Sequence, residues 1–193
     1  MTGLDLDRLA GPATWLALVA LILSGIALGL FFGGAGAFWG PVNDVLIVVA
    51  VLALIPAVLA VDRRAGDHAA PWTRIVTIAA LAGIVVMATG QSLLVAGRLS
   101  LEGSYVTGGV GVLPFLAWIG LVAVLSLASG VLPRPVGWLA VAVLGLIVVE
   151  AVVASVSPAP LLWATTIVLV LALAGWLAAL ASSFGSVATA AAV

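Results

Sequence analysis

Residues 135–156 read PVGWLAVAVLGLIVVEAVVASV, a stretch of 22 residues in which Glu150 is the single charged side chain. A helix rises about 1.5 Å per residue, so roughly 20 apolar residues cross the ~30 Å hydrocarbon core of a bilayer. The stretch is rich in valine but does not alternate, whereas a membrane β-strand needs only about 9–11 alternating residues. It therefore predicts a transmembrane helix that carries one carboxyl group.

The rest of the chain repeats this pattern. Five further apolar runs lie at about 12–33, 41–61, 73–97, 109–131 and 160–182, separated by short polar or Gly/Pro-containing joints. Pro56 and Pro114 fall inside two of the runs and predict kinks, because proline cannot donate the helical hydrogen bond. We predict an all-α, polytopic integral membrane bundle of six transmembrane helices, in which residues 1–193 form a single transmembrane domain.

The composition supports this fold class and excludes several functions. Hydrophobic residues make up 65% of the chain and charged residues 7%, against about 45–50% and about 25% in typical globular proteins. The net charge is −1 and no basic stripe is present, which argues against nucleic acid as a partner. Cysteine is absent and the single histidine, His68, lies in a polar joint, so we expect no metal site and no cofactor.

The placement of arginine predicts the orientation of the helices in the bilayer. With the N-terminus inside, the inner segments hold Arg8, Arg63, Arg64, Arg74 and Arg134, and the outer joints hold Arg98. This positive-inside bias predicts cytoplasmic N- and C-termini. All six basic residues are arginine, and together with the abundant Ala, Val, Leu and Gly this indicates a GC-rich bacterial genome. We therefore expect a multi-pass protein of the bacterial plasma membrane.

The most polar joint follows the second run and begins with Asp62, Arg63 and Arg64. One interpretation is a solvated loop whose arginines set the topology. The other is a cytoplasmic docking surface or a contact with anionic lipid.

Two sets of regularly spaced glycines predict smooth helix faces. They are Gly25, Gly29 and Gly33 in the first run and Gly83, Gly90 and Gly97 in the third. Small residues at such spacings let a second helix approach closely. We expect both faces to serve packing within the chain, and a homodimer seam is the alternative for the first.

Six polar residues lie in the outer halves of the predicted helices. The candidate polar site comprises Asp44, Gln91, Arg98 and Glu150, with Asn43 and Glu102 at its periphery. Gln91 lies seven residues before Arg98 and Glu150 lies seven residues before Ser157, which places both roughly 10 Å below the outer ends of their helices. A charged group at that depth is unfavourable unless it is paired, so Glu150 should face Gln91 or Arg98. This predicts that the third and fifth helices are neighbours.

Two interpretations of this cluster stay open. It is either a small polar site open to the outside or a structural clamp between the third and fifth helices. Asp44 has a further interpretation, as an acidic residue that the helix dipole favours near a helix N-terminus.

The sequence contains no recognisable catalytic constellation, so we expect no enzyme. Serines such as Ser24, Ser92 and Ser126 have no histidine or lysine within the bilayer to activate them. Short joints and glycine faces favour a non-catalytic structural or partner membrane protein, bound to the lipid bilayer and to a second copy or another membrane protein. The alternative is a small carrier or ligand-sensing protein that uses the outer cluster around Glu150, with this carboxyl group coupled to protons.

Overall fold

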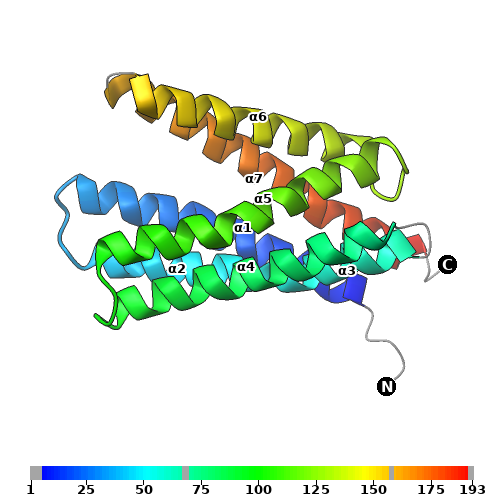
Figure 1. Ribbon diagram of the computed structural model, residues 1–193, viewed down its shortest axis with the longest axis horizontal. Coiled ribbons are helices and arrows are strands. Elements are labelled where there is room, and N and C mark those ends of the chain that lie inside the picture. The colour runs from blue at the N-terminus through cyan, green and yellow to red at the C-terminus, as the bar shows by residue number, and fades with distance from the viewer. Residues whose placement is uncertain (1–5, 67–69, 157–158, 191–193) are drawn as a thin grey trace.

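The computed structural model describes residues 6–66, 70–156 and 159–190, and the regular structure of these residues is entirely helical. The helices are α1 (Leu6–Phe32), α2 (Trp39–Ala53), α3 (Ile55–Ala65), α4 (Pro71–Val95), α5 (Leu101–Leu127), α6 (Arg134–Val156) and α7 (Ala159–Ala190). Within the described chain, six segments are long and apolar enough to cross a membrane, and α2 and α3 together form one of them (Figure 1).

The two ends of the bundle differ in charge. The start of α1 and the end of α7 lie at the same end, which we call the arginine-rich end (Figure 1). This end holds Arg8, Arg63, Arg64, Arg74 and Arg134. The opposite, arginine-poor end holds Arg98, in the turn between α4 and α5.

Pro56 interrupts the second span, as the sequence predicts. Helices α2 and α3 meet at Leu54, and Pro56 lies in the first turn of α3. Because proline has no N–H, it cannot donate a hydrogen bond to the carbonyl of Leu52. Pro114 behaves differently, since α5 continues as one helix on both sides of it.

Helix α5 begins at Leu101 rather than near residue 109. The hydroxyl of Ser100 accepts a hydrogen bond from the N–H of Gly103 at 3.1 Å, so Ser100 is the N-cap. The glycines after Ser100 predict a joint because glycine disfavours a helix, but α5 runs through them and packs on α4. Glu102 is therefore in the first turn of a helix.

Glycine permits the close approach of α4 and α5. A methyl group at Gly83 would overlap the carbonyl of Gly111, and one at Gly90 would overlap the side chain of Thr107. Both glycines thus lie at a helix contact, as a smooth face allows. Gly97 does not, because it lies beyond the end of α4 with a φ of +65°, a conformation that favours glycine in turns.

The face of α1 that carries Gly25 and Gly29 is exposed. A Cβ added at either glycine would meet no atom within 4 Å, and Gly33 contacts only carbonyls from the end of α1. The packing expected along this face is therefore not found among the described residues of the chain. The homodimer alternative stays a prediction.

The core lies mainly in the half of the bundle nearer the arginine-rich end. Trp118 of α5 and Trp176 of α7 are fully buried and meet edge to face, with ring centroids 5.9 Å apart. On α6, the buried residues form a stripe that ends halfway along the helix. They are Val136, Gly137, Ala140 and Val143.

The other halves of α6 and α7 leave this core. No residue of α6 from Val148 to Val156 is buried, and none of α7 from Ala164 to Gly175. Figure 1 shows the two helices diverging together from α1 and α5 toward the arginine-poor end. In this half they pack on each other and form a projecting α6–α7 hairpin.

The order of packing corrects one expectation. Helix α4 packs on α5, α5 packs on α6, and α6 packs on α7, whereas α4 and α6 form no packed pair among the described residues. The prediction that the third and fifth spans are neighbours is therefore wrong. Equal depth in a bundle does not imply contact, because α5 lies between the two helices.

Candidate functional site

Part of the predicted polar cluster surrounds a cavity at the arginine-poor end. This cavity, which we call the Asp44 cavity, has a volume of about 540 Å³. Its lining residues come from α1, α2, α4 and α5 and are Leu28, Phe31, Phe32, Gly40, Asn43, Asp44, Ile47, Gln91, Leu94, Leu101, Ser104 and Tyr105. The structure thus brings Asp44, Asn43 and Gln91 together.

Asn43 holds Asp44 in place. The hydroxyl of Ser24 on α1 donates a hydrogen bond to Oδ1 of Asn43 at 2.6 Å, and Nδ2 of Asn43 donates to Oδ1 of Asp44 at 3.1 Å. Ser24 and Asn43 are buried, at 4% and 7% exposure, whereas Asp44 is half-buried. Asn43, expected at the periphery of the site, is the link between α1 and the carboxylate.

Gln91 reaches the same cavity from α4. Its Oε1 is buried and has no hydrogen-bond partner among the described residues. A buried amide oxygen without a partner is unfavourable by about 1–3 kcal/mol. Gln91 thus contributes to the wall of the cavity while its amide oxygen lacks a donor among the described residues.

Arg98 and Glu102 are not part of this cavity. Arg98 is exposed, and its backbone N–H closes the turn after α4 by donating to the carbonyl of Leu93 at 2.8 Å. Glu102 is exposed in the first turn of α5. Arg98, the basic residue of the predicted cluster, is therefore not a counter-ion for Asp44 in this cavity.

Glu150 lies elsewhere, on the α6–α7 hairpin. Its carboxylate accepts a hydrogen bond from the hydroxyl of Thr166 on α7 at 2.5 Å. The predicted contact with Gln91 or Arg98 is replaced by this link. Glu150 lies six residues before Val156, and Thr166 lies seven residues after Ala159, so both are roughly 9–10 Å from the ends of their helices. Since a short joint makes these runs antiparallel neighbours, this match in depth was readable from the sequence.

A network of charges at the arginine-rich end was not expected. Asp7 of α1 contacts Arg64 at 3.2 Å and Arg63 at 3.4 Å. The guanidinium of Arg64 also donates to the backbone carbonyl of Ser183 on α7 at 3.3 Å and lies 4.7 Å from the ring centroid of Phe184. The Arg64 side chain is only 13% exposed, so it joins α1, α3 and α7 rather than belonging to a solvated loop.

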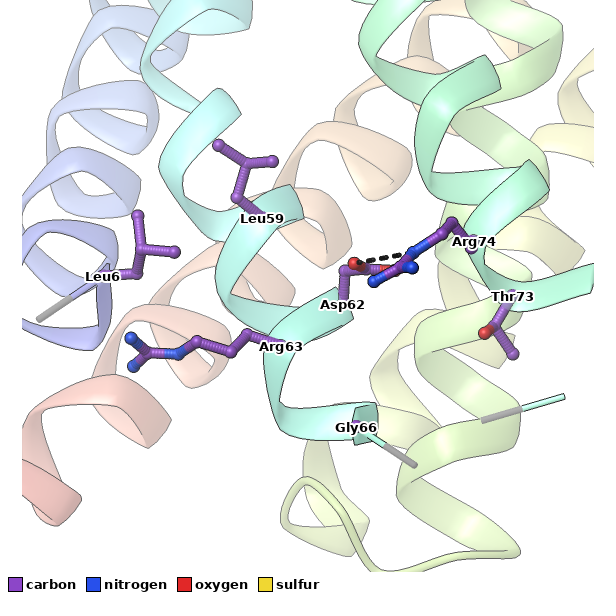
Figure 2. A pocket seen from close by; sticks show the side chains of 7 residues that line it. All are labelled: Leu6, Leu59, Asp62, Arg63, Gly66, Thr73 and Arg74. Carbon is purple, nitrogen blue, oxygen red and sulfur yellow. Dashed lines mark ion pairs between the residues drawn. The ribbon is translucent and has the colours of Figure 1, made fainter. Parts of the chain in front are cut away.

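A second cavity, which Arg63 of this network helps to line, has a volume of about 630 Å³. Figure 2 shows the side chains around it. We call it the Asp62 cavity, and it is lined by Leu6, Leu59, Asp62, Arg63, Gly66, Thr73 and Arg74. Arg74 contacts Asp62 at 3.9 Å, but its side chain is 78% exposed, so this pair contributes at most about 1 kcal/mol. His68 and Asp67, from the same polar joint, lie outside the described residues.

The described residues contain no arrangement that points to hydrolysis or metal binding. Ser24 donates to an amide oxygen and Ser126 to the carbonyl of Val122, so neither hydroxyl faces a base. Among these residues, no three His, Cys, Asp or Glu side chains gather as metal ligands. No protein-family model matches the chain, and neither a curated protein nor a solved structure is similar enough to match. The function must therefore be argued from the geometry.

Proposed function

We propose that this protein is a non-catalytic integral membrane protein of the bacterial plasma membrane that binds a membrane partner through its α6–α7 hairpin. Six apolar helical segments of sufficient length support a membrane-spanning chain. Five arginines at one end and one at the other support cytoplasmic termini. A cytoplasmic reporter tests this orientation.

The observation that carries the proposal is a half-buried polar pair on a projecting hairpin. Glu150 and Thr166 bind each other in the part of α6 and α7 where no described residue is buried. Lipid tails offer no hydrogen bonds, so polar groups at membrane depth normally face protein or water. One hydroxyl satisfies only part of a carboxylate, which has about four lone-pair sites.

A partner helix would complete this pair. Its expected chemistry is a transmembrane helix that places a hydrogen-bond donor level with Glu150 and covers the valines on the same side of α6. Val149 directly precedes Glu150 and is 47% exposed, and Val153 lies three residues after Glu150 and is not buried, which leaves room for such a helix. Interhelical hydrogen bonds in membranes contribute about 0.6–2 kcal/mol each, so the association would depend on packing as well.

Photocrosslinking in cells tests the proposal. A photoreactive residue at Val149 should give a discrete protein adduct, and this adduct should weaken when Glu150 is replaced by leucine. Val106 of α5 is the control, because it is also exposed, at 63%, and lies at a similar depth from the arginine-poor end. Identical adduct patterns at Val149 and Val106 would contradict the proposal. The adduct mass separates a second copy of the chain from another membrane protein.

A second candidate function is a small carrier or ligand sensor, and the Asp44 cavity favours it. Glu150 lies on a different helix pair, so we locate this function at Asp44 and Gln91 and not at Glu150. The chain has no cysteine, so single-cysteine variants report solvent access directly. A Gln91→Cys variant should react with a membrane-impermeant maleimide, whereas Ile84→Cys, at a fully buried position of α4, should not. Equal protection of both would contradict an open cavity.

A further inference from the structure

The Asp44 cavity holds an acidic side chain, and no basic residue is among the described residues that line it. Asp44 is the only charged residue among the described residues that line it. The carboxylate makes one hydrogen bond, with the amide of Asn43, and has no ion-pair partner within the described chain. A half-buried carboxylate in apolar surroundings is unfavourable unless a cation or proton accompanies it.

The surrounding charges strengthen this preference. In the half of the bundle at the arginine-poor end, the described residues include three acidic side chains, Asp44, Glu102 and Glu150, and one basic side chain, Arg98. Arg98 is exposed in the turn after α4 and does not line the cavity. The potential in the cavity therefore favours a positively charged ligand.

The walls indicate what kind of cation fits. Phe31, Phe32 and Tyr105 line the cavity, and the rings of Phe31 and Phe32 meet edge to face at 5.3 Å. Aromatic faces attract organic cations, and quaternary ammonium groups are the best-known case. Leu28, Ile47, Leu94 and Leu101 also line the cavity, and their apolar side chains suit the carbon substituents of such a cation.

Size and ligand count argue against a metal ion. The cavity volume of about 540 Å³ lies in the range of about 300–1,000 Å³ that is usual for sites of small organic molecules. Hard metal cations require about six or more oxygen ligands at short range. Here one carboxylate stands beside the amide of Gln91, whose buried Oε1 has no partner among the described residues.

We propose that the Asp44 cavity binds an organic monocation, either a quaternary ammonium or a protonated amine. Asp44 supplies the opposing charge, and the aromatic side chains of the wall contact the cationic head. This inference rests on the ligand-binding candidate function, and it names the chemical class of the ligand.

The test compares choline with 3,3-dimethylbutan-1-ol, which has the same shape but carries a carbon in place of the charged nitrogen. Binding of each to the full-length protein in nanodiscs is measured by calorimetry. Choline should bind at least about tenfold more tightly than the uncharged alcohol, as expected for one charge-assisted contact. Asp44→Asn should remove this preference. Glu102→Gln, which deletes an exposed acid from the same end, should retain it.

Each outcome decides between the inference and the function on which it rests. Tighter binding of the alcohol, or equal binding of both probes, leaves a ligand cavity but overturns the cationic ligand. Absence of binding by both probes overturns both the inference and the candidate function. If Asp44→Asn does not fold, Phe31→Leu keeps the carboxylate and should weaken choline binding about threefold without affecting the alcohol. Unchanged choline binding in that variant would contradict the aromatic contribution and overturn the proposed site.

Discussion

Replacing Arg64 with alanine tests the charge network at the arginine-rich end. Arg64 binds Asp7 at 3.2 Å and the carbonyl of Ser183 at 3.3 Å, and both charged side chains are 13% exposed. Its neighbour Arg63 also contacts Asp7, at 3.4 Å, but is 44% exposed. The two arginines are adjacent in the sequence, so they form a matched pair that differs in burial.

The expected magnitudes follow from this difference. Removing one partner of a buried ion pair lowers the free energy of unfolding by about 3–5 kcal/mol. Asp7 would keep Arg63, which offsets part of this loss, whereas the carbonyl of Ser183 would lose its guanidinium donor. We therefore expect Arg64→Ala to lower the free energy of unfolding by about 2–4 kcal/mol. Arg63→Ala should lower it by at most about 1 kcal/mol, as for an exposed pair.

The assay is reversible unfolding by SDS in mixed micelles, read by tryptophan fluorescence. A double-mutant cycle of Arg64→Ala with Asp7→Asn should give a coupling energy of about 1–3 kcal/mol, because the two residues are in direct contact. If Arg63→Ala lowers the free energy of unfolding as much as Arg64→Ala or more, the proposed role of Arg64 in joining α1, α3 and α7 is refuted. Such a result would restore the interpretation of both arginines as residues of a solvated loop.

Three further predictions concern other parts of the bundle. Thr166→Val should lower the free energy of unfolding by about 0.6–2 kcal/mol in the same assay, because it removes the hydroxyl that binds Glu150; no change would show that this bond does not hold the hairpin. Gly83→Ala should lower it by about 1–3 kcal/mol through overlap at the α4–α5 contact, whereas Gly25→Ala, on an exposed face of α1, should change it by less than about 0.5 kcal/mol. A reporter active only in the cytoplasm should work when fused after the C-terminus and fail when inserted after Arg98, and activity at both sites would contradict the proposed topology.

The candidate site could be predicted only in part. The sequence marks Asp44, Gln91 and Glu150 as polar groups in the outer halves of apolar runs, and counting residues places Gln91 and Glu150 at similar depth. It does not show that Asp44 and Gln91 share a cavity while Glu150 faces Thr166. That depends on which helices are adjacent and on how each is rotated about its axis.

The arginines illustrate the same division. The sequence places Arg63 and Arg64 together at the end of a span and marks both as signals of orientation. Their different roles arise because successive residues on a helix point about 100° apart. Arg64 is directed between α1 and α7, and Arg63 is directed toward solvent and the Asp62 cavity.

The sequence by itself determined the helical class, the number of apolar segments and their approximate ends. These are local properties, because each helix satisfies its own backbone hydrogen bonds and its length follows from its apolar run. Only the tertiary structure decided that α5 separates α4 from α6, that the α6–α7 hairpin leaves the core, and that a cavity forms around Asp44. The physical reason is that these helices are apolar on all sides, so periodicity does not mark a buried face. The contacts are set instead by the fit between small and large side chains on helices far apart in the sequence, such as Gly11 of α1 against Phe184 of α7.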